Sequence, residues 1–244
     1  MGSATNFNSL SKNPAVWPAR QTCTMSLRNH GSSPNTSEPM TIQSLAADVA
    51  LTLEKQLGQG PVHVVGHSLG GKVAMVLALE HPHLVEKLVV ADIAPANYST
   101  ASPQWSEVVQ VCEIVASIDP SGFQNRADCS AALADKGLGK DKTALIMQNL
   151  LPRPEGGYAW RVNGPVILES LPLLAQFPDY PRGTEGPPAL FIAGGKSSYI
   201  APEHHAEIER LFPDVKHAVI PHAGHWVHAE APMEFIGLVR DFLA

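Results

Sequence analysis

The fold is decided by the stretch PVHVVGHSLGGKVAMVLAL, residues 61–79. Residues 61–65 form a short β-branched run of the kind that builds a buried parallel strand. Val73–Leu79 is an apolar run that predicts a helix, which must end before Pro82. Between the two runs, residues 66–70 read Gly-His-Ser-Leu-Gly and match the pattern G-x-S-x-G. Strand, turn and helix therefore follow one another in the order that this pattern requires.

In this context the pattern predicts a nucleophile elbow, a strained turn that holds the Ser68 hydroxyl exposed at the carboxyl ends of the strands. Gly66 and Gly70 lack a Cβ, and we expect that a side chain at either position would clash where strand and helix cross. The N–H of Leu69 is expected to point at the same spot and to stabilise an oxyanion. The alternative is a glycine-rich turn with an incidental serine, and it requires both the pattern and its flanks to be accidental.

The rest of the chain alternates between helix and strand signals, except in its middle. A helix is predicted from Thr41, with Ile42, Leu45, Val49 and Leu53 on one face and Gly58 and Gly60 as its stop. The further predicted strands are 88–91, 189–193 and 217–220, and the further predicted helices are 202–211 and 233–243. Phe235, Leu238, Val239 and Phe242 are expected to face inward from the last helix. Buried-strand signals vanish between residues 97 and 186, where helical stretches with Pro and Gly breaks predict an inserted cap.

We therefore predict an α/β-hydrolase fold, a mostly parallel doubly wound sheet with an inserted helical cap. The expected divisions are residues 1–96 and 187–244 for the hydrolase core and 97–186 for the helical cap.

Composition limits the classes of partner. The chain of 244 residues has a formal net charge of −6 and no Lys/Arg cluster, so it lacks the positive field that nucleic-acid or anionic-membrane binding needs. Its longest apolar stretch, Val73–Leu79, is too short to cross a bilayer. We therefore expect small-molecule partners and no cofactor. The three cysteines are odd in number and not in metal-ligand spacing, which predicts packing residues rather than disulfides: Cys23, Cys112 and Cys129.

A serine nucleophile needs a base, and His225 fits best among eleven histidines. It lies in the loop 221–226, after the last predicted strand and before the closing helix. His222 and His228 are rivals. The three-residue spacing of these histidines also permits a zinc site, but no His-Glu-x-x-His or cysteine set supports that interpretation. His67 is expected to orient or line the site.

The acid that orients the base departs from the usual layout. Its common position is the loop 194–199, which reads Gly-Gly-Lys-Ser-Ser-Tyr and contains no carboxylate. Asp92, at the end of the preceding strand, is the substitute that we predict. The simpler interpretation is a capping role for Asp92 in the turn 92–95. Glu203 and Asp214 are fallback candidates.

Five segments together resemble a family of small α/β-hydrolases that comprises YbfF-type bacterial esterases and mitochondrial ABHD-type hydrolases, with yeast ethanol acetyltransferases as relatives. These segments are 28–34, 66–72, 92–95, 160–163 and 224–229. The resemblance implies a triad of Ser68, Asp92 and His225, short acyl ester or thioester substrates and, for eukaryotic members, a mitochondrial location. The absence of acidic residues from residues 1–37 also permits a transit peptide, but the match at 28–34 favours a loop of the catalytic domain.

The resemblance also implies a difference at the start of the chain. Family members carry three more strands and a His-Gly-Leu-Phe-Gly-Ser loop before the segment that matches residues 5–8, and only Gly2-Ser3 of that loop is present. The second oxyanion donor comes from that loop. In the family's strand order, a third strand lies between those matching 21–27 and 62–65, and its absence would leave a gap in the sheet. We therefore expect a fragment, or a shortened gene model, of an active enzyme.

Three functions are consistent with these residues. The leading prediction is ester or thioester hydrolysis through an acyl-enzyme. An alcohol acyltransferase would use the same residues with a different acceptor. A non-catalytic binding protein of the same fold is the third, because the oxyanion loop is absent. The cap is expected to set acyl specificity, with aromatic residues as candidate pocket lining: Tyr98, Trp105, Trp160 and Trp226.

Overall fold

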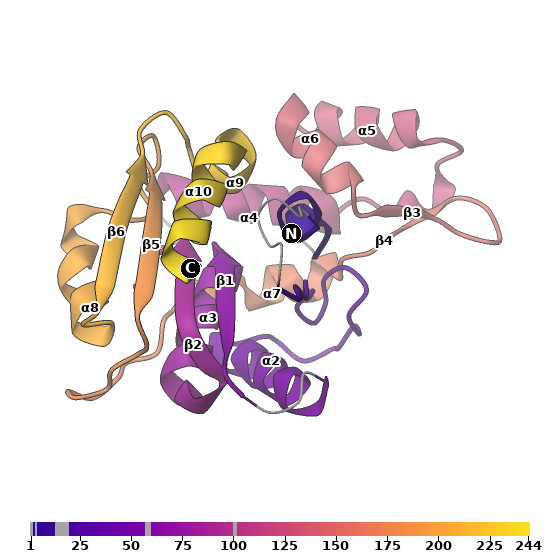
Figure 1. The fold of residues 1–244 in the computed structure, drawn as a ribbon. Helices are drawn as coiled ribbons and strands as arrows, with labels where there is room; N and C mark the ends of the chain where they lie inside the picture. The colour runs from indigo at the N-terminus through magenta and orange to yellow at the C-terminus, as the bar shows by residue number, and fades with distance from the viewer. Residues whose placement is uncertain (1, 3, 13–19, 57–59, 100–101) are drawn as a thin grey trace. The chain divides into compact units, whose positions relative to one another are not determined.

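The computed structural model describes residues 2, 4–12, 20–56, 60–99 and 102–244, and it consists of two compact units (Figure 1). Unit 1 comprises Met1–Lys12, Thr22–Met40 and Ser99–Leu173. Unit 2 comprises Asn13–Gln21, Thr41–Tyr98 and Leu174–Ala244. The chain leaves unit 2 after Tyr98 and returns to it at Leu174.

The core of unit 2 is a four-stranded parallel sheet in the order β1-β2-β5-β6. Its strands are β1 (Val62–His67), β2 (Val85–Ala91), β5 (Ala189–Gly194) and β6 (Val215–Ile220). These include the four strands that the apolar runs predicted. β2 lies between two neighbours, and Leu88–Ala91 are fully buried, as expected for a near-continuous apolar strand covered on both faces.

The register of the sheet aligns the carboxyl ends of β1, β2 and β5. His67 pairs with Ala91, and Ala91 pairs with Ile192. Backbone bonds continue this alignment one residue further, because the Ser68 N–H donates to Ala91 O (3.1 Å) and the Asp92 N–H donates to Ile192 O (2.8 Å). Ser68 and Asp92 therefore begin their loops side by side at one edge of the sheet.

Helices pack on this sheet as the apolar patterns predict. α2 (Ile42–Gln56) starts at Thr41, whose hydroxyl accepts the Ser44 N–H (3.0 Å). α3 (Leu69–Glu80) packs on β1 and β2, and α10 (Pro232–Leu243) packs on β5 and β6. Figure 1 shows α3 behind the strands and α10 in front of them. The shorter helical segments of unit 2 are η2 (Pro82–Leu84), η4 (Pro202–His204), α8 (His205–Leu211) and α9 (Val227–Glu230).

Several details of the helices and loops differ from the sequence prediction. On α10, Phe235 and Val239 are buried, whereas Leu238 and Phe242 are half-buried and Leu243 is buried in their place. Residues 21–27 form no strand. Cys23 is exposed rather than packed, while Cys112 and Cys129 are buried, and all three are free thiols. Gly58 lies outside the described residues. None of the described helices has the length and apolar character that crossing a membrane would take.

Unit 1 is mainly helical but contains a small sheet that the sequence did not predict. Its elements are η1 (Ala4–Phe7), α1 (Asn8–Ser11), α4 (Pro103–Ala116), η3 (Pro120–Gly122), α5 (Arg126–Asp135), α6 (Lys140–Met147), β3 (Leu150–Pro152), β4 (Tyr158–Trp160) and α7 (Gly164–Leu174). The last residue of α7, Leu174, already belongs to unit 2. β3 and β4 pair antiparallel around a turn with Gly156 and Gly157 at positive φ. Strands of three residues are too short to show a period-two pattern, so the sequence gives no signal for this hairpin.

The loop at residues 28–34 is ordered within unit 1 by Asn29, which is fully buried at a φ of 62°. Its side-chain oxygen accepts the Thr36 N–H (2.8 Å) and an amide N–H of Asn163 (3.1 Å), and its carbonyl accepts the Asn163 backbone N–H (2.9 Å). Two segments that carry the family resemblance, 28–34 and 160–163, are thus bonded to each other.

The packing of α3 against the sheet requires glycine at two positions, Gly66 and Gly71, whereas the sequence predicted Gly66 and Gly70. A Cβ on Gly66 would lie 2.3 Å from the carbonyl oxygen of Gly70, so no side chain fits. The expected clash at Gly70 is wrong, because a Cβ there would meet nothing within 4 Å. Gly71 takes that role instead, since its Cβ would lie 2.5 Å from Cγ2 of Ile93.

We expect Gly66→Ala to lower the free energy of unfolding by at least about 2 kcal/mol, because the atom it meets belongs to the backbone and cannot turn away. Gly70→Ala is the matched control, and it should change stability by less than about 1 kcal/mol, since it adds a methyl group to open space on a helix. Urea unfolding of both variants measures the difference. Equal destabilisation by the two substitutions would contradict this account of the elbow.

Candidate active site

Two residues predicted for the site hold strained backbone conformations. Ser68 has a φ of 52° and Asp92 a φ of 50°, and Asn29 is the remaining non-glycine residue with positive φ in the described part of the chain. A non-glycine residue in this region costs about 1–3 kcal/mol and persists where the surrounding structure over-determines it. Both strained residues directly follow a parallel strand, at the same edge of the sheet.

The three residues predicted as nucleophile, base and acid lie in contact within unit 2. His225 Nδ1 lies 2.8 Å from Asp92 Oδ2, and His225 Nε2 lies 3.0 Å from Ser68 Oγ. An ionised carboxylate only accepts hydrogen bonds, so Nδ1 carries the proton and Nε2 is left to accept the Ser68 O–H. The imidazole is thus set as the tautomer that can take a proton from serine.

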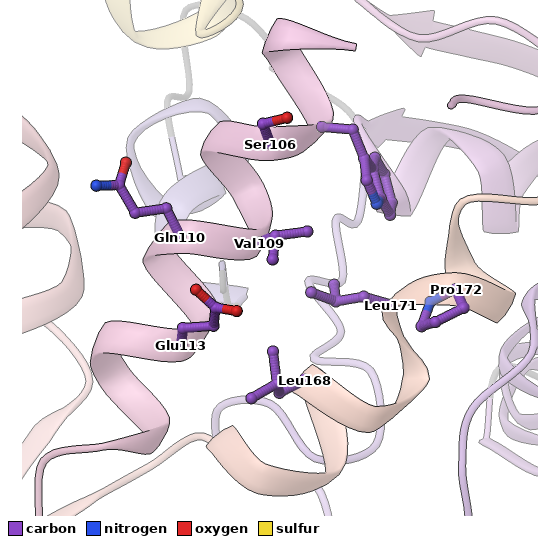
Figure 2. A pocket seen from close by; sticks show the side chains of 8 residues that line it. Ser106, Val109, Gln110, Glu113, Leu168, Leu171 and Pro172 are labelled. Carbon is purple, nitrogen blue, oxygen red and sulfur yellow. The ribbon is translucent and has the colours of Figure 1, made fainter. Parts of the chain in front are cut away.

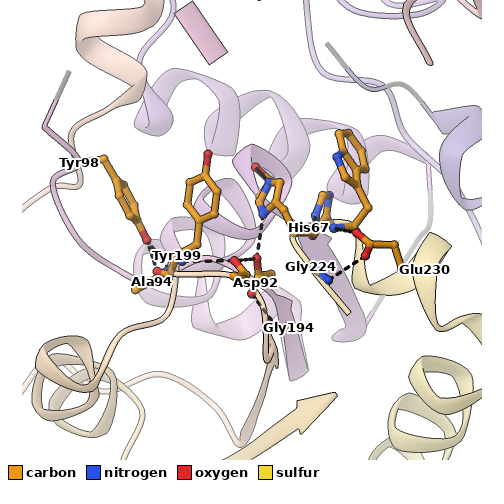
Figure 3. A network of polar contacts seen from close by, with 12 residues as sticks. His67, Asp92, Ala94, Tyr98, Gly194, Tyr199, Gly224 and Glu230 are labelled. Atoms are coloured by element: carbon orange, nitrogen blue, oxygen red, sulfur yellow. Dashed lines mark hydrogen bonds and ion pairs between the residues drawn. The ribbon is translucent and has the colours of Figure 1, made fainter. Parts of the chain in front are cut away.

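Asp92 is fully buried, and protein groups bond both of its carboxylate oxygens (Figure 3). Oδ1 accepts the Gly194 N–H at 2.9 Å, and Oδ2 accepts the Ser197 hydroxyl as well as His225 Nδ1–H. Ser197 lies in the loop after β5, where the sequence lacks the acid expected there. That loop therefore supplies a hydroxyl that holds an acid from the neighbouring strand. The only sequence signal that Ser197 bonds the Asp92 carboxylate was its place in the loop where an acid is expected.

The loop that carries His225 is held on both sides by Glu230, a residue that the sequence prediction missed. One Glu230 oxygen accepts the Gly224 N–H (2.8 Å) and the other accepts the Trp226 N–H (3.1 Å). Figure 3 shows the Glu230 carboxylate turned toward Gly224. The two bonded N–H groups flank His225, so one carboxylate fixes the backbone on either side of the base. In the structure, Glu230 is the last residue of α9. The sequence signal available for its role was its position five residues after His225.

His67 holds the same loop from the elbow. Its Nε2 lies 2.8 Å from the carbonyl oxygen of His225, and because a carbonyl only accepts, Nε2 carries the proton. Removal of the ring from water lowers the pKa of His67 well below its usual value, and neighbouring His225 and His228 lower it further. A neutral His67 thus donates to the base loop without adding positive charge beside it.

Aromatic rings surround the imidazole of His225. Tyr199 stacks on it with ring centroids 4.2 Å apart, and Trp226 lies 5.8 Å from it, edge-on. Trp226 also lies 5.1 Å from His67. His228, a rival for the base, packs 4.6 Å from His67, and burial lowers its pKa to about 4.

The second rival base and the two fallback acids lie away from this contact network. His222 is exposed and pairs with Glu234 at 3.3 Å. Glu203 and Asp214 are both exposed. Among the described residues, no group of three or more His, Cys, Asp or Glu side chains could hold a metal ion.

Leu69, the predicted oxyanion donor, is the first residue of α3. The N–H at this position of a helix has no intrahelical acceptor, and the positive end of the helix dipole lies there. It directly follows Ser68, so this N–H is available beside the serine hydroxyl.

Unit 1 contains a pocket of about 350 Å³ between α4 and α7 (Figure 2). Trp105, Val109, Leu168 and Leu171 give it apolar walls, with polar side chains including Glu113 beside them. Trp160, which the sequence suggested as pocket lining, is not among the lining residues of this pocket, and its indole N–H donates to Ile118 O at 2.9 Å.

Comparisons with a family model and with individual known proteins indicate the same family. Residues 4–232 match the family model described as the alpha/beta hydrolase fold. The chain is 37% identical to the sn-1-specific diacylglycerol lipase ABHD11 of Mus musculus over 247 aligned residues, which cover 100% of this chain and 78% of that protein. It is 32% identical to Esterase YbfF of Escherichia coli (strain K12), with coverage of 89% of this chain and 80% of the esterase.

Other relatives extend the range of named activities. A probable alcohol acetyltransferase of Saccharomyces cerevisiae is 28% identical over 99% of this chain and 74% of its own length. A solved structure of a marine microorganism esterase superposes with a TM-score of 0.91 and 32% identity, covering 99% of this chain and 91% of the esterase. The chain therefore belongs to the α/β-hydrolase family, among its esterases and lipases.

Proposed function

We propose that this chain hydrolyses short to medium acyl esters or thioesters through an acyl-enzyme on Ser68, with His225 as general base and Asp92 as the acid that orients it. The observation that carries the proposal is the unbroken contact from Ser68 Oγ through the imidazole of His225 to the buried carboxylate of Asp92. A serine hydroxyl is a weak nucleophile at neutral pH unless a base accepts its proton as it attacks.

In the first half-reaction, Ser68 Oγ attacks the carbonyl carbon of the ester while its proton passes to His225 Nε2. The imidazolium that forms is stabilised by the Asp92 carboxylate through the 2.8 Å contact at Nδ1. His225 then gives the proton to the leaving alcohol or thiol as the tetrahedral intermediate collapses. Ser68 is left esterified by the acyl group.

In the second half-reaction, water takes the place of the alcohol. His225 removes a proton from the water, which attacks the acyl-serine, and returns that proton to Ser68 Oγ as the acid leaves. The N–H of Leu69 is proposed to donate to the oxyanion in both steps, where one such donor is worth about a hundredfold to a thousandfold in rate.

The proposed substrate class follows the named activities of the relatives, which include a lipase and an esterase. The yeast relative named as a probable alcohol acetyltransferase suggests a second candidate, in which an alcohol replaces water in the second half-reaction. Turnover of p-nitrophenyl acetate with and without added ethanol separates the two, because an acyltransferase forms ethyl acetate whereas a hydrolase forms acetate.

We expect Ser68→Ala to lower kcat for p-nitrophenyl acetate by at least about a thousandfold, because the attacking oxygen is removed. Wild-type protein should also be labelled by a fluorophosphonate at Ser68, as mass spectrometry of its peptides would show. Ser37→Ala, a substitution of an exposed serine, is the matched control and should retain both activity and labelling. An unlabelled Ser68 in folded wild-type protein would favour a non-catalytic binding role and contradict the proposal.

We expect Glu230→Gln to lower kcat by about tenfold, because a glutamine presents one acceptor oxygen where two N–H groups now bond, and the loop of His225 loosens. Glu234→Gln is the control on the same surface, since Glu234 pairs with exposed His222 and contacts neither N–H. Steady-state kinetics on the two variants compare them, with circular dichroism as a check of folding. Equal kcat values for the two variants would show that Glu230 does not position the base.

A further inference from the structure

The strongest unexplained feature of unit 2 is a buried lysine on the helix that follows the elbow. Lys72 is 1% exposed and lies one helical turn after Ser68 on α3. Its ammonium donates to three consecutive carbonyl oxygens, those of Leu174 (3.3 Å), Ala175 (2.8 Å) and Gln176 (3.0 Å). No carboxylate among the described residues forms an ion pair with it.

A buried ammonium without a carboxylate is costly, so its surroundings have to compensate. An ammonium has three N–H donors, and three carbonyls accept them here. Leu174 is the last residue of α7, and the carbonyls at and beyond a helix end lack intrahelical partners and favour a nearby cation. Removal of the group from water lowers the pKa of Lys72 to about 7.

Lys72 also lies over the ring of Tyr98, with Nζ 4.8 Å from the ring centroid. A cation over an aromatic face is attracted by the ring, most strongly when both are out of water. The backbone N–H of Tyr98 donates to Ala175 O at 3.0 Å, so Lys72 and Tyr98 bond the same carbonyl. The point where the chain leaves unit 2 and the point where it returns are thereby bonded together.

The hydroxyl of Tyr98 bonds two backbone groups close to Asp92 and His225. It accepts the Ala94 N–H at 2.9 Å and donates to the carbonyl of Tyr199 at 2.6 Å. Ala94 lies two residues after Asp92, and the ring of Tyr199 stacks on His225. Figure 3 shows Tyr98 beside Tyr199 with its hydroxyl directed at Ala94. One hydroxyl therefore ties the loop of the acid to the residue that packs against the base.

We propose that Lys72 is a positioning residue that acts through Tyr98: it fixes the Tyr98 ring so that the hydroxyl holds the Asp92 loop and Tyr199 in the arrangement that aligns His225. Lys72 touches neither substrate nor the reacting atoms in this role. Because the inference rests on the mechanism proposed above, its test has to separate a failure of the positioning from a failure of the mechanism.

The competing hypothesis is that Lys72 contributes only to folding. A purely structural role would change the melting temperature and the fraction of folded protein, but it would leave kcat per active site unchanged. Titration of active sites with a fluorophosphonate gives the concentration of reactive serine, and kcat on that basis distinguishes the two roles. A positioning role also predicts that KM stays nearly constant while kcat falls.

The experiment is a double-mutant cycle with Lys72→Met and Tyr98→Phe, assayed with p-nitrophenyl acetate well below the melting temperature of each variant. Met retains the length of the lysine stem without charge or donors, and Phe removes only the hydroxyl. Each single variant should lower kcat by about tenfold to a hundredfold, as expected for a small misplacement of catalytic groups, with KM changed by less than about threefold. The double variant should lose no more than the more affected single variant, because both act through the same hydroxyl.

Losses that multiply in the double variant, or unchanged kcat per active site in Lys72→Met, would overturn the inference. If Lys72→Met does not give folded protein, Lys72→Gln, which keeps two N–H donors, takes its place in the same cycle under the same criteria. Ser68→Ala is measured alongside. Full activity of that variant would overturn the acyl-enzyme mechanism itself, whereas an inactive Ser68→Ala together with multiplying losses would overturn the role of Lys72 alone.

Discussion

The structure depends on one constraint, the in-register alignment of the carboxyl ends of β1, β2 and β5. His67, Ala91 and Ile192 lie on one line across the sheet, and the residues that follow continue the ladder by one bond. Ser68 and Asp92 are therefore side by side before any side chain is considered. Both residues have positive φ values, and the backbone bonds of the ladder hold them in this strained conformation.

The proposed base, His225, lies in the loop after β6, where several single contacts hold it. Glu230 bonds the N–H groups on either side of His225, and His67 bonds its carbonyl. Tyr199 packs against its ring, and Tyr199 is in turn tied through Tyr98 to the region of Lys72. The proposed acid, Asp92, is itself buried and bonded at both carboxylate oxygens.

The sequence predicted the sheet and the elbow because strong local signals define them. Buried parallel strands have apolar runs, and G-x-S-x-G between a strand and a helix restricts both the turn and its chemistry. Contacts made by residues far apart in sequence carried no such signal. In the sequence, Ser197 stood in a loop without an acid, Glu230 lay before the predicted closing helix at 233–243, and Lys72 was only part of a motif. The carbonyl partners of Lys72 lie more than a hundred residues away. The clash predicted for Gly70 belongs to Gly71, because a pattern does not say which glycine faces the neighbouring strand.

We propose that a buried carboxylate directly after β2, in place of one after β5, orients the imidazole that activates Ser68. The most direct measurement is kcat/KM of Asp92→Asn for p-nitrophenyl acetate, on protein shown to be folded by circular dichroism. Because asparagine keeps the shape but favours the wrong tautomer of His225, this account predicts a loss of about ten-thousandfold. A variant that retains kcat/KM within about tenfold of the wild-type value would contradict it.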